Sequence, residues 1–551
     1  MPTINLLTQT ALTKSTDQNS ANLINMYLVV SNQIEQQDQD KYSTAAYPTP
    51  GATLFSAGST AIRALFSEHG VTYGIDGSTF FKVNSSGTRT TLGTLNTSTG
   101  WAKIRGLSDQ LLIADSTNLY YYKITANVFG QPINSAYVSS VSVTAAGNNY
   151  TAPTAVINDS TGTGATVTVS TQQGQVSAIN IVTPGSGYSN NPTIVISDST
   201  GSGATGAVYV TQSSVPSLIQ DIECQDEFGL VLQQNSQVWF ASNISDLTTY
   251  PILSFASTTG NQNYNTAIIS LHRELYILGT QTTEVWDNAG QANFTFARNQ
   301  NTFIEWACAA RSSVARANNT IYFLAQSQTG GRVVMQMAGY TPQKISNSAI
   351  DYQLSTYSTV SDAFAFTYQQ ERHEFYVLTL PTAGVTFVYD VSTQAWHQRQ
   401  SLSGGNQIQW FPSSYTFNYN KCLVGDTNTG NIYYLDMTNY TENGNAITRT
   451  IQTHPFYQAG SWIYTDKLQI DFDTSPGASL SNWNLFVSRD GGYTYGSAKP
   501  ASPQQDANGM WRVYWLRLGQ AHSNTFKITT NAAMKTIVLG AWAKMRFGDE
   551  V

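Results

Sequence analysis

Charged side chains are scarce in this sequence. Asp, Glu, Lys and Arg make up 11% of its 551 residues, whereas about 25% is usual in soluble globular proteins. The formal net charge is −7, which argues against a surface built to grip nucleic acid, because such a surface carries a basic stripe. It leaves open a channel wall along which DNA slides, since a wall that must not hold DNA should lack cations.

Cysteines, long apolar runs and export signals are also few or missing. The three cysteines, Cys224, Cys308 and Cys422, are odd in number and far apart, so we expect folding in a reducing cytoplasm without a disulfide framework. No stretch approaches the roughly 20 apolar residues of a membrane span, and the opening MPTINLLTQTALTKST lacks the basic and apolar regions of a secretory signal. The neutral polar composition is nevertheless typical of proteins that work outside cells, and release by lysis, as for a virus particle, would reconcile the two.

Short β-strands are abundant. Between residues 71 and 436 one pattern recurs, in which an apolar strand is followed by a polar turn and a second strand rich in Tyr, Trp or Val. Turn sequences such as Asp-Gly and Gly-Gly at the centres of these units predict hairpins. The seven predicted hairpins begin at Val71, Leu111, Phe228, Glu274, Thr320, Glu374 and Lys421.

The spacing of these hairpins predicts a β-propeller. Their starts follow one another at blade-like intervals, except for a gap of 117 residues between the second and the third. We therefore expect an all-β chain whose body is a propeller of six or seven blades; a mixed β-sandwich with unrelated hairpins is the alternative. Trp286 and Trp396, near the ends of two second strands, are expected to pack in blade cores.

The long gap contains a duplication. NDSTGTGAT at 158–166 and SDSTGSGAT at 197–205 are nearly identical, and the match extends over 141–169 and 179–208. A phosphate-binding loop would need its glycines between a strand and a helix N-terminus, whereas strand-like sequence lies on both sides here and no lysine is near. We predict turns in a duplicated β insert over 135–212 that is looped out of one blade.

The two ends of the chain differ from its body. Residues 1–55 are rich in Gln, Asn and Ser and are expected to be irregular, with QIEQQDQDKYS solvated and flexible. From residue 446 to 551, alternating strands separated by Pro-, Gly- and Asn-rich loops predict a β-sandwich-like domain. The propeller body then occupies 56–134 and 213–445.

The sharpest local motif is SRDGGYTYG. Its Ser488, Asp490, Gly492, Thr494 and Tyr495 fit the pattern S-x-D-x-G-x-T-W/Y, which resembles the Asp-box of sialidases and related propellers. The Ser and Asp side chains of such a motif hydrogen-bond the backbone of a hairpin turn. We therefore interpret the five residues as a structural turn and not as an active site.

No residue pattern predicts catalysis, a metal or a cofactor. Asp221, Glu223 and Glu227 form the densest acidic cluster and could act as paired carboxylates in glycoside hydrolysis, but we favour a solvated strand edge. The histidines lack the spacing of zinc ligands, and no G-x-S-x-G elbow is present. The six isolated histidines are His69, His272, His373, His397, His454 and His522.

Several stretches, taken in order, resemble the tail nozzle or packaged-DNA stabilisation proteins of short-tailed (podovirus) bacteriophages. No single stretch is highly specific, so order and spacing carry the resemblance, which covers the chain apart from about 135–212. The stretches are NLINMYLVV and YPTPGATLF, then TQTTEVWDNAGQANFTF, ANNTIYFLAQSQTGGRVVMQMAGYTPQKISNSAI, VYDVSTQAWHQR and LFVSRDGGYTYG.

The resemblance implies a structural role in the virion tail. Members of that family form a hexameric tube beneath the portal and its adaptor ring, extend the DNA channel and receive a needle or plug at the far end. They retain packaged DNA, often support tailspikes or fibres, and assemble in the host cytoplasm. The family has no catalytic residues or cofactors to carry over, so a non-enzymatic protein is expected.

Two other functions stay open at this point. The first is a tail-borne glycan hydrolase or lyase on a propeller scaffold, with Asp221, Glu223 or Glu227 as candidate acids. The second is a carbohydrate-binding adhesin that uses the insert at 135–212.

Overall fold

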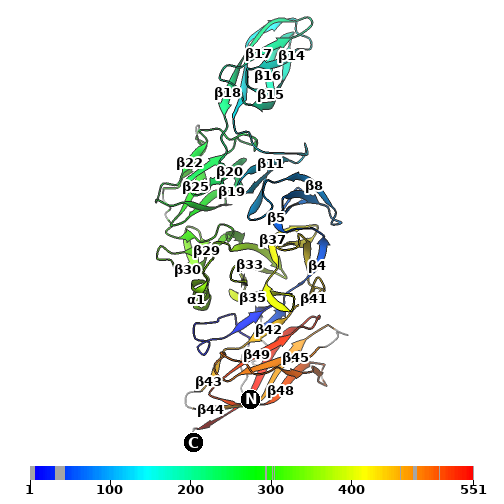
Figure 1. Cartoon of the computed structure of the whole chain (residues 1–551), viewed down its shortest axis with the longest axis vertical. Coiled ribbons are helices and arrows are strands. Elements are labelled where there is room, and N and C mark those ends of the chain that lie inside the picture. Colours follow the sequence, from blue (N-terminus) through cyan, green and yellow to red (C-terminus); the bar gives the residue numbers. More distant parts are fainter. Residues whose placement is uncertain are drawn as a thin grey trace, which may run out of the picture. The chain divides into compact units, whose positions relative to one another are not determined.

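The computed structural model describes residues 7–30, 44–291, 294–300, 302, 304–458, 461–475, 481–507 and 509–549. Strands dominate, which confirms the expected all-β class, and the described residues contain one helix, α1 (Ser348–Thr356) (Figure 1). The chain divides into two compact units, each described here by itself. Unit 1 is Met1–Thr94, Leu278–Thr283 and Thr302–Val551, and unit 2 is Leu95–Ile277 and Glu284–Asn301.

Unit 1 contains four blade sheets, numbered by their order in the whole chain. Predicted hairpins supply their two central strands, which confirms the hairpins at Val71, Thr320, Glu374 and Lys421. Blade 1 consists of β5 (Ile62–Glu68), β6 (Val71–Asp76), β7 (Thr79–Val83) and β8 (Arg89–Thr94). Blade 5 consists of β27 (Ala307–Cys308), β28 (Ala315–Ala317), β29 (Thr320–Gln326), β30 (Arg332–Ala338) and β31 (Thr341–Lys344). Blades 6 and 7 consist of β32 (Phe364–Gln370), β33 (His373–Leu380), β34 (Val385–Asp390) and β35 (Ala395–Ser403), and of β37 (Pro412–Asn418), β38 (Lys421–Asp426), β39 (Ile432–Asp436) and β4 (Gly51–Ser56).

The fourth strand of blade 7 comes from the other end of the chain. β4 pairs antiparallel with β39, with Ala52 opposite Leu435, so a strand that precedes blade 1 completes the last blade. Apolar side chains from neighbouring blades then pack together, for example Ile62 and Phe81 of blade 1 with Leu423 of blade 7. The sequence pattern did not predict this long-range pairing.

Unit 2 contains three further blade sheets, except that Leu278–Thr283 of the last of them is assigned to unit 1. The described residues therefore hold seven blade sheets, the higher of the two predicted numbers. The hairpins from Leu111, Phe228 and Glu274 again form the central strands. Trp286 packs edge-on against Trp239 in a blade core, as expected. Trp396 is likewise buried, in the core next to blade 6. Blade 2 consists of β9 (Ala102–Leu107), β10 (Gln110–Asp115), β11 (Leu119–Lys123) and β12 (Val128–Gly130). Blade 3 consists of β19 (Ile219–Gln225), β20 (Phe228–Gln233), β21 (Val238–Ala241) and β22 (Phe255–Ser257). Blade 4 consists of β23 (Asn265–Leu271), β24 (Glu274–Gly279), β25 (Thr283–Asn288) and β26 (Phe296–Arg298).

The duplicated sequence forms a small β structure between blades 2 and 3 of unit 2, drawn in cyan to green in Figure 1. Its strands form three antiparallel pairs, β13 with β18, β14 with β17 and β15 with β16. In each pair one strand comes from the first copy of the repeat and the other from the second. The strands are β13 (Ala136–Asn148), β14 (Thr154–Asn158), β15 (Thr163–Gln172), β16 (Gln175–Ser186), β17 (Thr193–Ser197) and β18 (Ser202–Gln212).

Two sheets pack face to face in the last part of unit 1, around a core that includes Leu23, Leu468 and Ile528. The first sheet continues from blade 6, because β1 runs parallel to β35 and antiparallel to β42. Its strands are β1 (Asn22–Ile24), β42 (Arg449–Gln452), β43 (Phe456–Tyr457), β45 (Trp483–Ser488), β46 (Lys499–Ala501) and β49 (Ser523–Thr530). The second sheet comprises β2 (Met26–Val30), β3 (Thr44–Pro48), β44 (Ser461–Asp473), β47 (Gln504–Gln505), β48 (Trp511–Ala521) and β50 (Ile537–Asp549). The remaining short strands are β36 (Asn406–Gln409), β40 (Thr441–Glu442) and β41 (Asn445–Ala446).

The expectation of an irregular segment over 1–55 is wrong for β1 to β4. These strands are short and are flanked by polar stretches, yet each places an apolar side chain in a core; Leu23, Met26 and Ala46 are nearly inaccessible to solvent. The alternation extends over too few residues to stand out in the sequence. The stretch QIEQQDQDKYS, expected to be flexible, lies outside the described residues.

Candidate functional site

The acidic cluster singled out in the sequence is a pair of buried ion pairs between two blades. Lys103 Nζ lies 2.7 Å from Asp221 Oδ1, and Arg105 Nε lies 2.9 Å from Glu223 Oε1. Asp221 also accepts a hydrogen bond from the Ile268 backbone N–H of blade 4. Both carboxylates are 2% exposed, so the predicted solvated edge is wrong for them.

The correction has a simple physical cause. Asp221 and Glu223 alternate along β19 and point to the same face, where β9 presents Lys103 and Arg105 with the same alternation. Burial acts to lower the pKa of Arg105, and the charges of Glu223 and Asp221 more than offset it. Glu227 lies apart in the turn before β20 and accepts a hydrogen bond from Ser245. Asp221 and Glu223 are therefore each engaged by a cation, and Glu227 lies apart from them.

The histidines serve separate contacts in the described part of the chain. His373 Nδ1 lies 2.7 Å from Asp390 Oδ2, and His397 is buried under Tyr27 and Phe375. The His522 ring packs at a tilt against Trp462. Within the described residues, no three His, Cys, Asp or Glu side chains are placed to hold a metal ion.

The SRDGGYTYG motif folds as a tight turn after β45. Ser488 Oγ accepts from the Gly492 N–H at 2.8 Å and donates to Asp490 at 2.6 Å, while Asp490 Oδ1 accepts from the Thr494 N–H at 2.9 Å. Burial acts to raise the pKa of Asp490, but the hydrogen bonds from Ser488 and Thr494 lower it to about 2. The Tyr495 ring lies beside the Lys527 ammonium group.

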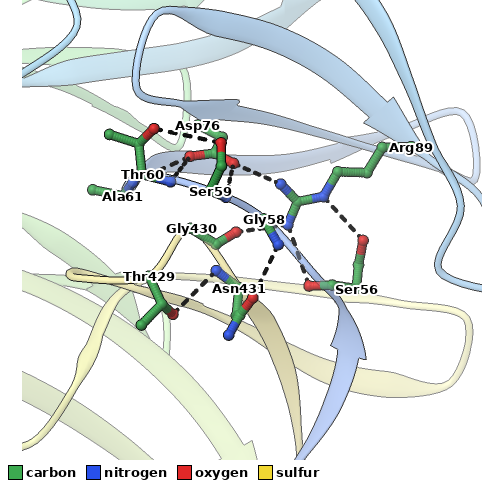
Figure 2. A network of polar contacts seen from close by, with 10 residues as sticks. All are labelled: Ser56, Gly58, Ser59, Thr60, Ala61, Asp76, Arg89, Thr429, Gly430 and Asn431. Atoms are coloured by element: carbon green, nitrogen blue, oxygen red, sulfur yellow. Dashed lines mark hydrogen bonds and ion pairs between the residues drawn. The ribbon is translucent and has the colours of Figure 1, made fainter.

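A network of polar contacts in unit 1 surrounds Asp76, at the place where β4 completes blade 7 (Figure 2). Asp76 accepts hydrogen bonds from the backbone N–H groups of Ser59, Thr60 and Ala61 at 3.0–3.1 Å. Its Oδ2 also lies 2.9 Å from Arg89 Nη1. The carboxylate thus fixes the chain between β4 and β5.

Arg89 links the same point to the last blade. Its guanidinium donates to Ser56 Oγ at 2.9 Å and to the Gly430 carbonyl at 2.7 Å, and Asn431 accepts from the Gly58 N–H at 2.9 Å. Five donors of one guanidinium can serve several acceptors in one plane. This network was not predicted from the sequence. A signal was present, because three of the hairpins carry an aspartate at the same position of the central turn, namely Asp76, Asp115 and Asp426.

In the insert, each copy of the repeat holds the other. Asp159 of the first copy accepts from the Ser189 N–H of the second at 3.0 Å, and Asp198 of the second accepts from the Ala152 N–H of the first at 2.7 Å. The backbone N–H groups of Ala204 and Ala165 likewise donate across copies, to the hydroxyls of Tyr150 and Tyr188.

The glycines of the repeat are required by these tyrosines. A Cβ on Gly201 would lie 2.5 Å from the ring of Tyr150, and one on Gly162 would lie 2.4 Å from the ring of Tyr188. Both tyrosines are buried. The two halves therefore interlock around an approximate twofold axis, which explains why the repeat occurs in two copies.

Hydrogen exchange in one copy of the repeat, measured after a substitution in the other copy, will test this interlocking. Tyr150→Phe removes an acceptor in the first copy, so we expect exchange to rise about five-fold, or about 1 kcal/mol, at residues 201–204 of the second copy. Tyr188→Phe should act in mirror fashion on residues 162–165. Hydrogen–deuterium exchange mass spectrometry of the full chain provides the measurement, and a rise confined to the substituted copy would contradict the interlocked pairing.

The polar networks of Asp76, Asp490 and the insert have the same structural role. Their side chains accept hydrogen bonds from backbone N–H groups and hold turns and strands together. A family model described as bacteriophage P22 Gp10, beta-propeller, named Phage_stabilise, matches residues 9–440. The chain belongs to this family. It is a phage structural protein with a β-propeller fold, and its seven blade sheets, with β4 completing the last, lie within the matched residues.

Solved structures share only a distant likeness with the chain. A computationally designed protein, Ika8, is 11% identical, with a TM-score of 0.33 over 70% of this chain and 100% of its own. The Pan2 WD40 domain of Neurospora crassa is 7% identical, with a TM-score of 0.36 over 70% of this chain and 95% of its own. The N-terminal domain of Nup159 is 8% identical, with a TM-score of 0.33 over 74% and 98%. No curated protein matches the chain.

Proposed function

We propose that the chain is a tail nozzle protein of a short-tailed phage. Six copies form a tube beneath the portal and its adaptor ring, extend the DNA channel and keep the packaged genome in the head until ejection. The tube receives a needle or plug at its far end and carries tailspikes or fibres. It belongs to the virion tail and assembles in the host cytoplasm.

The family match over residues 9–440 carries this proposal. Composition supports it, because the chain is acidic and the insert contains no Lys or Arg at all, as suits a conduit that does not hold DNA. Among the described residues, no helix is long and apolar enough to cross a membrane.

The proposed role is non-enzymatic. The acids considered for glycan hydrolysis, Asp221 and Glu223, each neutralise a partly buried cation, and removing one would leave that cation without its partner. In the insert, Tyr150 and Tyr188 are buried and offer no ring to a sugar, whereas Tyr209 of β18 is 53% exposed. The adhesin alternative therefore needs a test of its own.

The decisive experiment is a phage that cannot make this protein. We expect its heads to fill and then lose their DNA, and complementation in trans with the full chain should restore filled particles. Electron microscopy of complemented particles should show six copies in a ring below the portal. Filled, stable heads without the protein would refute the proposal.

A matched variant separates the adhesin alternative from the nozzle role. Deleting residues 136–212 joins Ser135 to Ser213, whose backbones are already hydrogen-bonded at 3.1 Å. We expect such particles to keep their DNA. Loss of cell attachment by these filled particles would assign a receptor role to the insert, whereas loss of DNA would make the insert part of the conduit.

A further inference from the structure

The outward face of the second sandwich sheet carries a hollow. It lies on β44 and β50, has a volume of about 340 Å³, and is lined by Lys467, Gln469, Asp471, Trp542 and Lys544. These residues lie beyond position 440, outside the part of the chain that the family model matches. We call these five residues the sandwich patch.

Two lysines face each other in the patch. Lys467 of β44 lies directly opposite Lys544 of β50 in the antiparallel ladder. Like charges in this position destabilise a sheet, and neither lysine forms an ion pair with any described residue. The Lys467 ammonium lies 4.9 Å from the ring centre of Tyr514. Two lysines on one face of the sheet can both reach an anionic group bound in the hollow.

Two positions further along the ladder, on the same face, Gln469 lies opposite Trp542. Asp471 fixes both side chains, because it accepts from Gln469 Nε2 at 2.8 Å and from Trp542 Nε1 at 2.9 Å. Asp471 is 4% exposed, and Arg512 Nε lies 3.6 Å from its Oδ1. The half-exposed indole ring is therefore held in one orientation before any ligand arrives, which reduces the entropy cost of binding.

We propose that the sandwich patch binds an acidic saccharide. The apolar C–H face of a sugar ring packs on Trp542, its carboxylate lies between Lys467 and Lys544, and its hydroxyls bond to Gln469. The patch combines an aromatic platform, two cations and a polar amide, which together match a uronic acid residue. This inference does not depend on the nozzle role proposed above.

Single-stranded DNA fits the same patch less well. Its bases could stack on Trp542 and its phosphates could meet the lysines. However, deoxyribose within a strand offers no free hydroxyl to Gln469. Nucleic acid therefore serves as a competing outcome in the test.

Affinity electrophoresis of the full chain measures this binding directly. We expect polygalacturonate in a native gel to retard the protein and neutral dextran to leave its mobility unchanged. Trp542→Ala and the double variant Lys467→Gln/Lys544→Gln should each raise the dissociation constant for polygalacturonate about ten-fold or more. The double variant should also raise the thermal midpoint, since it removes the like-charge pair, so weaker binding cannot be attributed to unfolding.

Matched control variants lie on the same sandwich. Lys499→Gln removes an exposed lysine of β46, and Tyr457→Ala removes a tyrosine that is 66% exposed; both should bind polygalacturonate as the parent does. Three results overturn the proposal: no retardation of the parent, equal retardation by dextran, or equal loss in the control variants. Tighter binding to a single-stranded oligonucleotide than to polygalacturonate would assign the patch to nucleic acid and overturn the proposal too.

Discussion

Asp76→Ala should lower the free energy of unfolding by about 3–5 kcal/mol, because it leaves Arg89 partly buried without a counter-charge. Three backbone N–H groups, of Ser59, Thr60 and Ala61, lose their acceptor at the same time. Urea-induced unfolding followed by tryptophan fluorescence measures the change as a lower midpoint. The effect arises where β4 completes blade 7, so it should also expose that strand to proteolysis.

Substitution of the partner residue Arg89 should lower the free energy of unfolding less than Asp76→Ala does. In Arg89→Met the Asp76 carboxylate keeps its three backbone donors, and we expect a loss of about 1–3 kcal/mol. The double variant should then be less destabilised than the sum of the two single variants, because the uncompensated cation is gone.

A matched aspartate provides the control for this experiment. Within the described residues, the Asp436 carboxylate accepts only from Thr438, through its N–H and hydroxyl, in an exposed turn. Asp436→Ala should cost about 1 kcal/mol. If Asp76→Ala costs no more than Asp436→Ala, the Asp76–Arg89 network is an ordinary turn and does not secure the last blade.

The hairpins could be predicted from the sequence, whereas the first strands of the blades could not. Asp-Gly and Gly-Gly mark the central turns, but the two-residue turns before them use pairs such as His272–Arg273 and Glu371–Arg372. All four of these residues have positive φ, a conformation that such side chains rarely adopt. Tertiary packing imposes these turns, and the local sequence does not predict them.

The polar site shows the same division between local and long-range information. The Ser488–Asp490 turn depends on neighbours within nine residues, so its motif is visible in the sequence. The ion pairs of Asp221 and Glu223 depend on cations 118 residues earlier, and the Asp76–Arg89 network depends on Gly430, 341 residues after Arg89. Alternation on one strand predicts which side chains share a face, but not which strand lies opposite.

His397 provides the second prediction. Its ring in β35 packs against Tyr27 and edge-on against Phe375, and it is 2% exposed. Burial lowers its pKa to about 3; the Asp390 charge opposes this shift, and the charges of Arg399 and His373 add to it. His397 therefore stays neutral in the folded chain under all but strongly acidic conditions.

Acid should therefore destabilise the fold through His397. In the unfolded chain a histidine binds its proton below about pH 6.5, so the free energy of unfolding should fall by about 1.4 kcal/mol per pH unit from there towards pH 3, or by about 2 kcal/mol at pH 5. Above pH 6.5 both states are neutral at this position, and the residue contributes no pH dependence. Urea midpoints measured at about pH 5 and about pH 7.5 should thus differ less in His397→Gln than in the parent. His69→Gln, which removes a side chain that is 54% exposed, should keep the parent's difference; an unchanged pH dependence in His397→Gln would show that this imidazole is protonated inside the fold.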